Sequence, residues 1–390
     1  MIGIKTLNSI SPVYRDVLDM NEYTVGDAVE NADAILVRSF NMHEFEPDKT
    51  VKCVARAGAG TNNIPVDAYA EKGIVVFNTP GANANAVKEL TIAAILLASR
   101  KIVNGIEWAQ TLKGADGDVA KLVEKGKNQF VGPELSGKKL GVIGLGEIGV
   151  KVANAGIALE MQVYGYDPYI SVEHAWMLSR SVKHVNTLDE ILKNCDYITV
   201  HVPLTDATRN TINAEALAAM KPNCALINMA RGELCDTDAV LAALGSGALR
   251  VYATDFPNEK LLGCDKVIAI PHLGASTPES EDNCVEMASR EIDAFLKTGA
   301  ITHSVNFPAI DPGAVAMPRL VLLHGNVPNM VGSITSALAR CGLNIENMAN
   351  KSRGNHAVTV IDVGDAPDEA LCVELAAIAN MYSVRMILPE

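Results

Sequence analysis

Three residues suited to acid–base chemistry follow apolar, strand-like runs in this chain: Arg231, Glu259 and His272. Histidine titrates near neutral pH, so His272 can take the proton of a hydroxyl group. A carboxylate such as Glu259 can fix the tautomer of that imidazole and stabilise its charged form. Arg231 can bind a carboxylate bidentately and polarise the carbonyl beside it. The set predicts hydride transfer from an alcohol that carries a neighbouring negative charge.

A hydride needs an acceptor, and the run Gly144-Leu145-Gly146-Glu147-Ile148-Gly149 has the spacing of a dinucleotide-binding turn. Gly144 allows the tight turn, Gly146 lets the backbone approach a pyrophosphate, and Gly149 lets the next helix pack closely. The N-terminus of that helix offers free N–H groups to phosphates. The run therefore predicts a dinucleotide site.

Asp167 ends the strand that follows this helix. A carboxylate there can accept hydrogen bonds from the adenosine ribose and repel a 2′-phosphate. Pro168 and Tyr169 supply no cation to offset that repulsion. The expected cofactor is NAD rather than NADP.

Two series of short apolar runs alternate with helical stretches, which predicts two parallel, doubly wound sheets. The first series has strands at 2–6, 34–37, 52–55 and 74–77, and the second at 140–143, 162–166, 197–200, 225–228, 251–254 and 267–270. Ligands of such sheets bind beyond the carboxyl ends of the strands. Besides the residues above, this rule selects Arg38-Ser39, Gly58–Asn62, Asn78–Asn83, His201, Asn228–Arg231 and Asp255–Glu259.

The C-terminal part has a different pattern. Ser276 and Glu279 have capping-box spacing before a helix that is expected to run to Lys297, and 306–313 is a Pro/Gly linker. Expected elements then follow in the order strand 319–323, helix 330–341, strand 343–351, strand 357–363, helix 369–379 and strand 384–388. This βαββαβ order predicts a ferredoxin-like module after the two α/β domains.

Composition narrows the class of partner. The formal net charge of −13 argues against nucleic acid, and no apolar run reaches the about 20 residues that span a bilayer. The N-terminus lacks the apolar core of a signal peptide, and the eight cysteines lack C-x-x-C spacing. A cytoplasmic protein with reduced thiols and no metal site is expected.

Four motifs together resemble the D-2-hydroxyacid dehydrogenases over about residues 1–310: Arg56–Asn62, Val200–Thr205, Asn228–Gly232 and Pro271–Gly274. The resemblance implies a substrate domain at 1–92 and 285–305 and an NAD-binding domain at 93–284, with a cleft that closes over both ligands. It implies substrate contacts by Arg38, Ser39, Gly58, Ala59, Gly60 and Asn83. The implied NAD contacts comprise the glycine turn and Asp167, Pro168, His201, Val202, Pro203, Thr208, Ala230, Arg231, Asp255, His272, Gly274 and Ala275.

Within this family the chain most resembles the D-3-phosphoglycerate dehydrogenases, and residues 316–390 are similar to an ACT domain. This implies oxidation of 3-phosphoglycerate, with His324, Asn326 and Asn344 at positions that bind the inhibitor serine across an ACT–ACT interface. It also implies a homodimer, with 104–135 as an arm, or a homotetramer. Two departures stand out: Asp255–Glu259 is one residue shorter than usual, and Val327-Pro328-Asn329 replaces Arg-Pro-Gly.

Two other functions fit the same sequence. One is a reductase for glyoxylate, hydroxypyruvate or a 2-keto dicarboxylate, which a substrate panel would identify. The other is an NAD-sensing, corepressor-like binding protein, since such relatives keep residues like Arg231 and His272. Peptide partners without dehydrogenase activity would favour that second function.

Overall fold

The computed structural model describes residues 1–389, which form two compact units: 1–82 with 281 onward, and 83–280. The last residue of the expected 316–390 module lies outside the described part. The first boundary falls at 82/83 rather than at 92, because helix α2 (Ala84–Ser99) packs on α5 (Glu147–Ala158) and on strands of the second unit.

The first unit is built on a parallel sheet whose strand order is β2-β1-β3-β4-β5. Four strands match the expected series: β1 (Ile2–Leu7), β3 (Ala34–Val37), β4 (Cys53–Arg56) and β5 (Val75–Asn78). The edge strand β2 (Tyr23–Gly26) was not expected, because only Tyr23 in it is buried. The short helices η1 (Pro12–Asp16) and α1 (Val66–Glu71) connect the strands.

Helix α10 (Pro278–Thr298) contributes Ile292 and Phe295 to the core of this sheet. Its cap is one residue later than expected: the Thr277 hydroxyl accepts a hydrogen bond from the Ser280 amide at 3.0 Å. Pro278 then takes the first helical position, where a missing N–H costs nothing.

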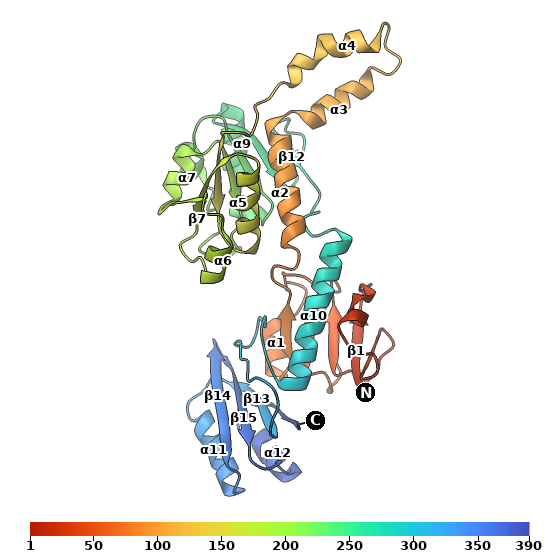
Figure 1. Cartoon of the computed structure of the whole chain (residues 1–390), viewed down its shortest axis with the longest axis vertical. Helices are drawn as coiled ribbons and strands as arrows, with labels where there is room; N and C mark the ends of the chain where they lie inside the picture. The colour runs from red at the N-terminus through yellow and green to blue at the C-terminus, as the bar shows by residue number, and fades with distance from the viewer. Residues whose placement is uncertain (390) are drawn as a thin grey trace. The chain divides into compact units, whose positions relative to one another are not determined.

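The C-terminal elements confirm the βαββαβ order. They are β13 (Arg319–Gly325), α11 (Met330–Arg340), β14 (Ile345–Arg353), β15 (His356–Val363), α12 (Glu369–Ala376) and β16 (Met381–Ile387). They form an antiparallel sheet of order β14-β15-β13-β16 (Figure 1). The arrangement is ferredoxin-like, as the pattern predicted.

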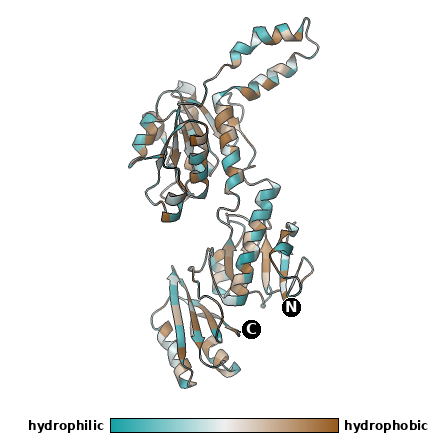
Figure 2. Ribbon diagram, viewed as in Figure 1, coloured by the Kyte–Doolittle hydropathy of each residue, from teal (hydrophilic) through white to brown (hydrophobic). Residues whose placement is uncertain are grey.

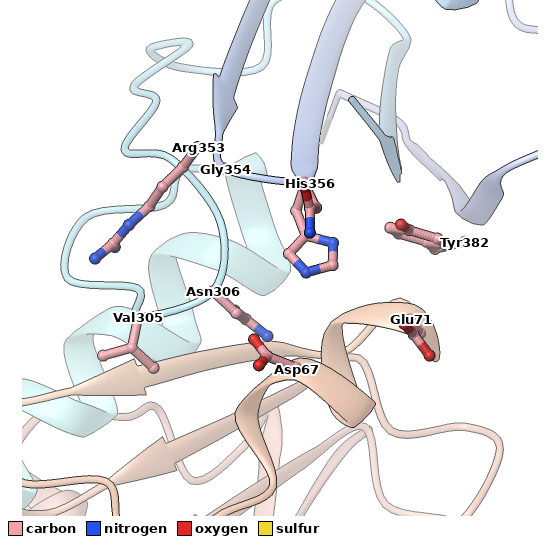
Figure 3. A pocket seen from close by; sticks show the side chains of 9 residues that line it. Asp67, Glu71, Val305, Asn306, Arg353, Gly354, His356 and Tyr382 are labelled. Carbon is pink, nitrogen blue, oxygen red and sulfur yellow. The ribbon is translucent and has the colours of Figure 1, made fainter. Parts of the chain in front are cut away.

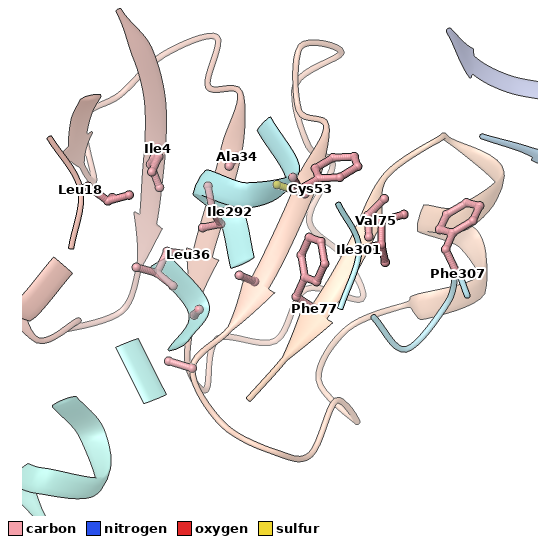
Figure 4. Close-up of a cluster of buried hydrophobic side chains, with 14 of the residues drawn as sticks. Ile4, Leu18, Ala34, Leu36, Cys53, Val75, Phe77, Ile292, Ile301 and Phe307 are labelled. Carbon is pink, nitrogen blue, oxygen red and sulfur yellow. The ribbon is translucent and has the colours of Figure 1, made fainter. Parts of the chain in front are cut away.

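The two faces of this C-terminal antiparallel sheet pack against different parts of the first unit. Leu320 and Leu322 pack under α11 and α12, whereas Val321 and Leu323 belong to the same core as Phe77 and other residues of the first sheet. Figure 4 shows that shared core around the parallel strands and α10. The module therefore has its own helices but shares one hydrophobic core with the N-terminal sheet.

The second unit has seven parallel strands in the order β12-β11-β10-β9-β6-β7-β8. They are β6 (Lys139–Ile143), β7 (Gln162–Tyr166), β8 (Lys183–His184), β9 (Tyr197–Val200), β10 (Cys224–Asn228), β11 (Leu249–Thr254) and β12 (Val267–Ala269). Besides α2 and α5, its helices are α6 (Val172–Met177), α7 (Leu188–Asn194), α8 (Ala214–Ala219), η3 (Gly232–Leu234) and α9 (Thr237–Ser246). Six strands match the expected series, and β8 was missed because both of its residues are exposed. Hydrophobic residues concentrate along the strands (Figure 2).

A helical arm extends from the second unit after α2 (Figure 1). It consists of α3 (Ile102–Thr111), α4 (Val119–Gly126) and η2 (Lys127–Phe130), and Trp108 packs on Phe130 with ring centroids 5.3 Å apart. Ile102, Val103 and Ile106 on this arm are exposed. Among residues 1–389, no helix is long and apolar enough to cross a membrane.

Candidate active site

The glycine turn between β6 and α5 has the geometry that a pyrophosphate site requires. Gly144 has φ of 90°, and a Cβ there would lie 2.8 Å from the His201 backbone. A Cβ on Gly149 would lie 1.9 Å from the Gly144 carbonyl oxygen, so only glycine lets α5 start so close to the strand. A Cβ on Gly146 would meet nothing within 4 Å, which leaves its backbone open to a ligand. These residues fit a dinucleotide.

The carboxylate of Asp167 is held at the end of β7 by the same turn. Its Oδ2 accepts a hydrogen bond from the Leu145 amide at 2.8 Å, and its Oδ1 accepts one from the Tyr169 amide at 2.8 Å. Pro168 between them is exposed, and Ile148 packs into the core beside the turn. The acid is thus fixed where a ribose would lie in this fold.

Glu147 is the first residue of α5, and the sequence did not reveal its partner. Its Oε1 lies 3.1 Å from Nε2 of His174 on α6, and Nδ1 of that histidine contacts the Ser171 hydroxyl at 3.1 Å. Helix α6 therefore reaches the glycine turn through a side-chain pair. Neither composition nor spacing signals such a contact across 27 residues.

The loop after β9 is closed by its own side chains. The Thr208 hydroxyl donates to the Pro203 carbonyl at 2.6 Å, and Val202 lies against Gly144. His201 contacts the Thr199 hydroxyl at 2.9 Å, and burial lowers the pKa of His201 to about 3. A neutral His201 therefore backs the glycine turn and does not act as a proton carrier near neutral pH.

Arg231 lies in the loop after β10, and hydrogen bonds from the buried side chain of Asn228 fix the backbone of this loop. Asn228 donates to the Arg231 carbonyl at 2.8 Å and accepts from the Ala230 amide at 3.1 Å. The Arg231 side chain is exposed, and its Nη1 donates to the Ala230 carbonyl at 2.6 Å. Its other donors remain available for a planar anion.

Phe256 connects Arg231 and His272, and it was not among the expected site residues. The Arg231 guanidinium carbon lies 5.8 Å from the centre of the Phe256 ring, and the His272 ring lies 4.5 Å from it on centroids. A cation and an imidazole on one aromatic ring are oriented by that ring. Phe256 thus brings the two expected catalytic side chains to one place. The strand-end rule selected the segment that contains Phe256, but it gave this residue no role.

Asp255 is the buried acid of this cluster, at 1% exposure. Burial raises its pKa, and the nearby charges of His272 and Arg231 oppose that rise. A Cβ on Gly274 would lie 3.3 Å from Asp255 Oδ2, so the glycine leaves room for the carboxylate. The next residue, Ala275, is half-buried at the start of the connection to α10.

Glu259 is exposed at the end of the same loop. Within residues 1–389 its side chain makes no hydrogen bond or ion pair. No hydrogen bond or ion pair joins Glu259 to His272 in the described chain, and the catalytic role of Glu259 stays a prediction. Burial raises the pKa of Asp255 and the charge of His272 opposes that rise, so Asp255 is a second candidate for the acid that partners His272.

The expected substrate residues, apart from Asn83, lie in the first unit. Arg38 pairs with Glu281 at 2.6 Å, and the Ser39 amide donates to Asn8 at 3.2 Å. The loop Gly58-Ala59-Gly60 is fixed from β5, because Asn78 donates to the Ala59 carbonyl at 2.6 Å. Asn83 belongs to the second unit, where it precedes α2.

The three expected effector residues have partners inside the module. His324 is 2% exposed, contacts Thr359 at 2.8 Å, and has a pKa that burial lowers. Asn326 donates to the Gly354 carbonyl at 3.0 Å, and Asn344 donates to Glu346 at 2.6 Å. Only the two asparagines are exposed. Serine binding at these residues remains untested.

Comparison with known proteins gives the same assignment as the geometry. Residues 92–274 match the family model "D-isomer specific 2-hydroxyacid dehydrogenase, NAD binding domain". The matched range contains the glycine turn and Asp167, and it confirms NAD as the expected cofactor.

Several relatives carry the name D-3-phosphoglycerate dehydrogenase, and two of them differ in how much of their length this chain covers. The protein of Methanocaldococcus jannaschii is 39% identical over 73% of this chain and 53% of its own length. The protein of Haemophilus influenzae is 30% identical over 96% of this chain and 90% of its own length. The chain thus spans about half the length of the first relative and nearly all of the second.

Solved structures agree with the fold. The NAD-bound 3-phosphoglycerate dehydrogenase of Entamoeba histolytica has a TM-score of 0.59 at 26% identity, covering 78% of this chain and 98% of its own. The strand order, the glycine turn and the relatives that match over most of this chain lead to one assignment. The chain belongs to the D-isomer specific 2-hydroxyacid dehydrogenase family.

Proposed function

We propose that the protein catalyses the NAD-dependent oxidation of 3-phosphoglycerate to 3-phosphohydroxypyruvate, the first step of the phosphorylated route to serine. The observation that carries this proposal is the cluster of Arg231 and His272 on Phe256, beside the buried Asp255. The names of the relatives at 39% and 30% identity support the choice of substrate within the family.

NAD would be held by the turn Gly144–Gly149 and by Asp167, and it supplies the acceptor for the C2 hydride. His272 takes the proton of the C2 hydroxyl on an imidazole nitrogen. Arg231 holds the substrate carboxylate bidentately and stabilises the developing carbonyl. Asp255 or Glu259 then stabilises the imidazolium.

The remaining substrate contacts are proposed for the first unit. Backbone N–H groups of Gly58, Ala59 and Gly60 can bind an anion, and Arg38 and Ser39 are candidates for the phosphate. Asn83 is a further candidate at the start of α2.

The test is an assay of NADH consumption on 3-phosphohydroxypyruvate, hydroxypyruvate, glyoxylate and 2-oxoglutarate. We expect the highest kcat/KM for the phosphorylated substrate. Turnover of glyoxylate or hydroxypyruvate alone would instead identify a keto acid reductase. No turnover at all, combined with tight NAD binding, would favour the sensor function.

Oligomerisation through the arm is part of this proposal. The exposed Ile102, Val103 and Ile106 form an apolar stretch on the projecting helices. A second copy covering this stretch would make a homodimer, and pairing of the C-terminal modules would raise it to a tetramer. Light scattering of the wild-type protein and of an Ile106→Glu variant distinguishes these states, because the variant should dissociate only the arm contact.

Inhibition by serine is the last part. Asn326 and Asn344 are exposed and could take part in such a site, whereas His324 is already bonded. Adding serine to the assay tests inhibition, and Asn344→Ala tests whether it acts at this edge of the module.

A further inference from the structure

The glycine turn that fits the pyrophosphate of NAD carries an acid. Gly146 is the N-cap of α5, and Glu147 is the first residue of this helix. The free N–H groups of a helix N-terminus attract a phosphate, and they attract a carboxylate of the first turn as well. The Glu147 carboxylate therefore competes with a pyrophosphate for these N–H groups and repels its charge. A group that offsets this acid would favour NAD binding.

His174 on α6 is placed to offset the acid. Its Nε2 lies 3.1 Å from Glu147 Oε1, so the carboxylate lies against α6. Its Nδ1 lies 3.1 Å from Oγ of Ser171, which also accepts a hydrogen bond from the His174 amide. The Ser171 hydroxyl can donate to Nδ1 of a neutral ring, which then keeps its own proton on Nε2 and donates it to Glu147. The imidazolium donates from both nitrogens, so protonation adds a positive charge beside the carboxylate without breaking the contact.

Three other charged groups belong to the elements around this pair. Lys151 lies one helical turn after Glu147 on α5, Glu173 precedes His174 on α6, and Asp167 follows β7. Lysine and carboxylate side chains ordinarily titrate outside the range from about pH 6 to pH 8, whereas histidine titrates within it. Among these five residues, His174 is therefore the one whose charge changes near neutral pH.

Helix α6 has anchors that do not involve this pair. The Asn154 side chain, on α5, donates to the Met177 carbonyl at the end of α6 at 2.9 Å. Ile170 and Leu178, on either side of α6, pack against the core of the second unit. These contacts hold α6 in place, so a substitution of His174 should change the electrostatics of the glycine turn and not the position of the helix.

We propose that His174 is a positioning residue of the NAD site. It draws the Glu147 carboxylate to α6, and its imidazolium form neutralises the charge of that carboxylate, which leaves the N–H groups of the turn to the pyrophosphate. Because the imidazolium is favoured beside a bound pyrophosphate, binding is tighter at a pH where His174 carries its second proton. This inference needs NAD binding alone and does not depend on the proposed substrate.

The test is isothermal titration of the full chain with ADP-ribose, and with adenosine as the ligand that lacks the pyrophosphate. ADP-ribose also lacks the nicotinamide ring, which limits any contribution from His272. We expect the Kd for ADP-ribose to rise by about two- to fivefold from about pH 6 to about pH 8, the usual size of a charge effect at a helix N-terminus. The Kd for adenosine should stay unchanged over this range.

Two variants separate the acid from its partner. His174→Gln keeps a hydrogen-bond donor for Glu147 but has no titrating charge, so its Kd for ADP-ribose should equal the wild-type value of about pH 8 at both pH values. Glu147→Gln removes the opposing carboxylate, so this Kd should fall by about two- to fivefold at about pH 8. Two matched controls should bind like the wild type: His184→Gln, at an exposed position of the same unit, and Glu71→Gln, on α1 of the other unit (Figure 3).

Trp176, which is 85% exposed on α6, reports on the position of this helix. The chain has two tryptophans, so a Trp108→Phe background leaves Trp176 as the single emitter. We expect the same emission spectrum with and without His174→Gln. If the emission shifts, the Glu147→Gln titration decides, because that substitution leaves His174 and α6 unaltered.

Three results would overturn the inference. One is a pH dependence in His174→Gln equal to that of the wild type, which would assign the effect to another group. Another is weaker ADP-ribose binding in Glu147→Gln, which would make the carboxylate itself a contact of the ligand. The third is an equal pH dependence for adenosine, which would show that the pyrophosphate is not involved.

Discussion

Two arginines show how differently this chain uses the same side chain. Arg231, in the second unit, is exposed, and within residues 1–389 its side chain makes a single hydrogen bond, to the Ala230 carbonyl next to it. Arg319, in the C-terminal module, is 1% exposed and makes six hydrogen bonds, two of them to Asp362. The guanidinium of Arg319 is bonded on every nitrogen, whereas that of Arg231 keeps donors without a protein partner among residues 1–389.

The same contrast extends to the surroundings of each arginine. Arg319 binds the carbonyls of Thr298, Gly313 and others, so it joins α10, the linker and the sheet of the module. Arg385 adds to this junction by bonding Phe295 and Leu296 carbonyls and lying 4.3 Å over the Phe295 ring. The arginine in the candidate site therefore keeps N–H donors that are unpaired in the described chain. The arginines at the junction of the C-terminal module with α10 and the linker use their donors to hold these elements together.

The largest effect should come from a substitution in the candidate active site around Arg231. His272→Ala removes the proposed base, and kcat should fall by about 10²–10⁴ with NAD binding retained. Steady-state kinetics and NAD titration measure the two quantities. His184→Ala, at an exposed position of the same unit, serves as the control and should keep full activity. An unchanged kcat in His272→Ala would remove this residue from the mechanism.

Substitutions at the junction of the C-terminal module should lower the stability of the fold rather than the activity. Arg319→Met leaves Asp362 without its partner, and the free energy of unfolding should fall by about 3–5 kcal/mol, the usual cost of breaking a buried pair. Denaturant titration measures it. Arg340→Met breaks the exposed pair with Glu374 and should cost at most about 1 kcal/mol. Equal losses of unfolding free energy in the two variants would contradict the stabilising role of the buried Arg319.

Asp167 offers a third comparison, within the cofactor site. Asp167→Ala removes the carboxylate expected at the ribose, so the Kd for NAD should rise by about tenfold while NADP binding changes less. Fluorescence titration with both cofactors gives the ratio. Asp189→Ala, an exposed acid paired with Lys193, is the matched control. Equal losses for NAD and NADP would argue against the ribose contact.

A fourth effect is a pH dependence of stability, caused by a buried acid in the first unit. Glu291 is 4% exposed, and burial raises its pKa to about 8. Because the folded state then holds a proton that the unfolded chain releases, this group destabilises the fold as pH rises from about 5 to 8, by at most about 1.4 kcal/mol per pH unit. Glu291→Gln should flatten that slope in unfolding measured across this pH range.

His303 bears on this result, because its Nδ1 lies 2.6 Å from Glu291 Oε1. Repeating the measurement in a His303→Ala background separates its titration from that of the acid. Glu286→Gln, at an exposed position of the same helix, should retain the wild-type slope. A slope that persists in Glu291→Gln would show that another group causes it.

Much of this architecture is readable from the sequence, because buried parallel strands are continuous apolar runs. Strands β3, β7 and β9 match their expected ranges, and the glycine spacing located the cofactor turn. Strands β2 and β8 escaped because their exposed residues carry no such run. A run of apolar residues indicates a buried strand, so strands that are partly exposed cannot be predicted from such runs.

Contacts between distant elements could not be predicted. The strand-end rule selected the segment of Phe256 but not its contact with Arg231, and no local signal marks the contact of His174 with Glu147. Glu259 was proposed from its place after a strand, but the short loop leaves it exposed. Val321 and Leu323 look like any buried strand positions, although they join the core of the first sheet.

That shared core makes the C-terminal module a poor candidate for removal. Cutting the chain after its Pro/Gly linker would remove Val321 and Leu323 from the core that they share with Phe307 and Ile310 in the intact first unit. The truncated chain would expose an apolar surface and tend to aggregate. Exchanging the module between relatives would require the residues under it to be exchanged as well, so the two parts are expected to have diverged together.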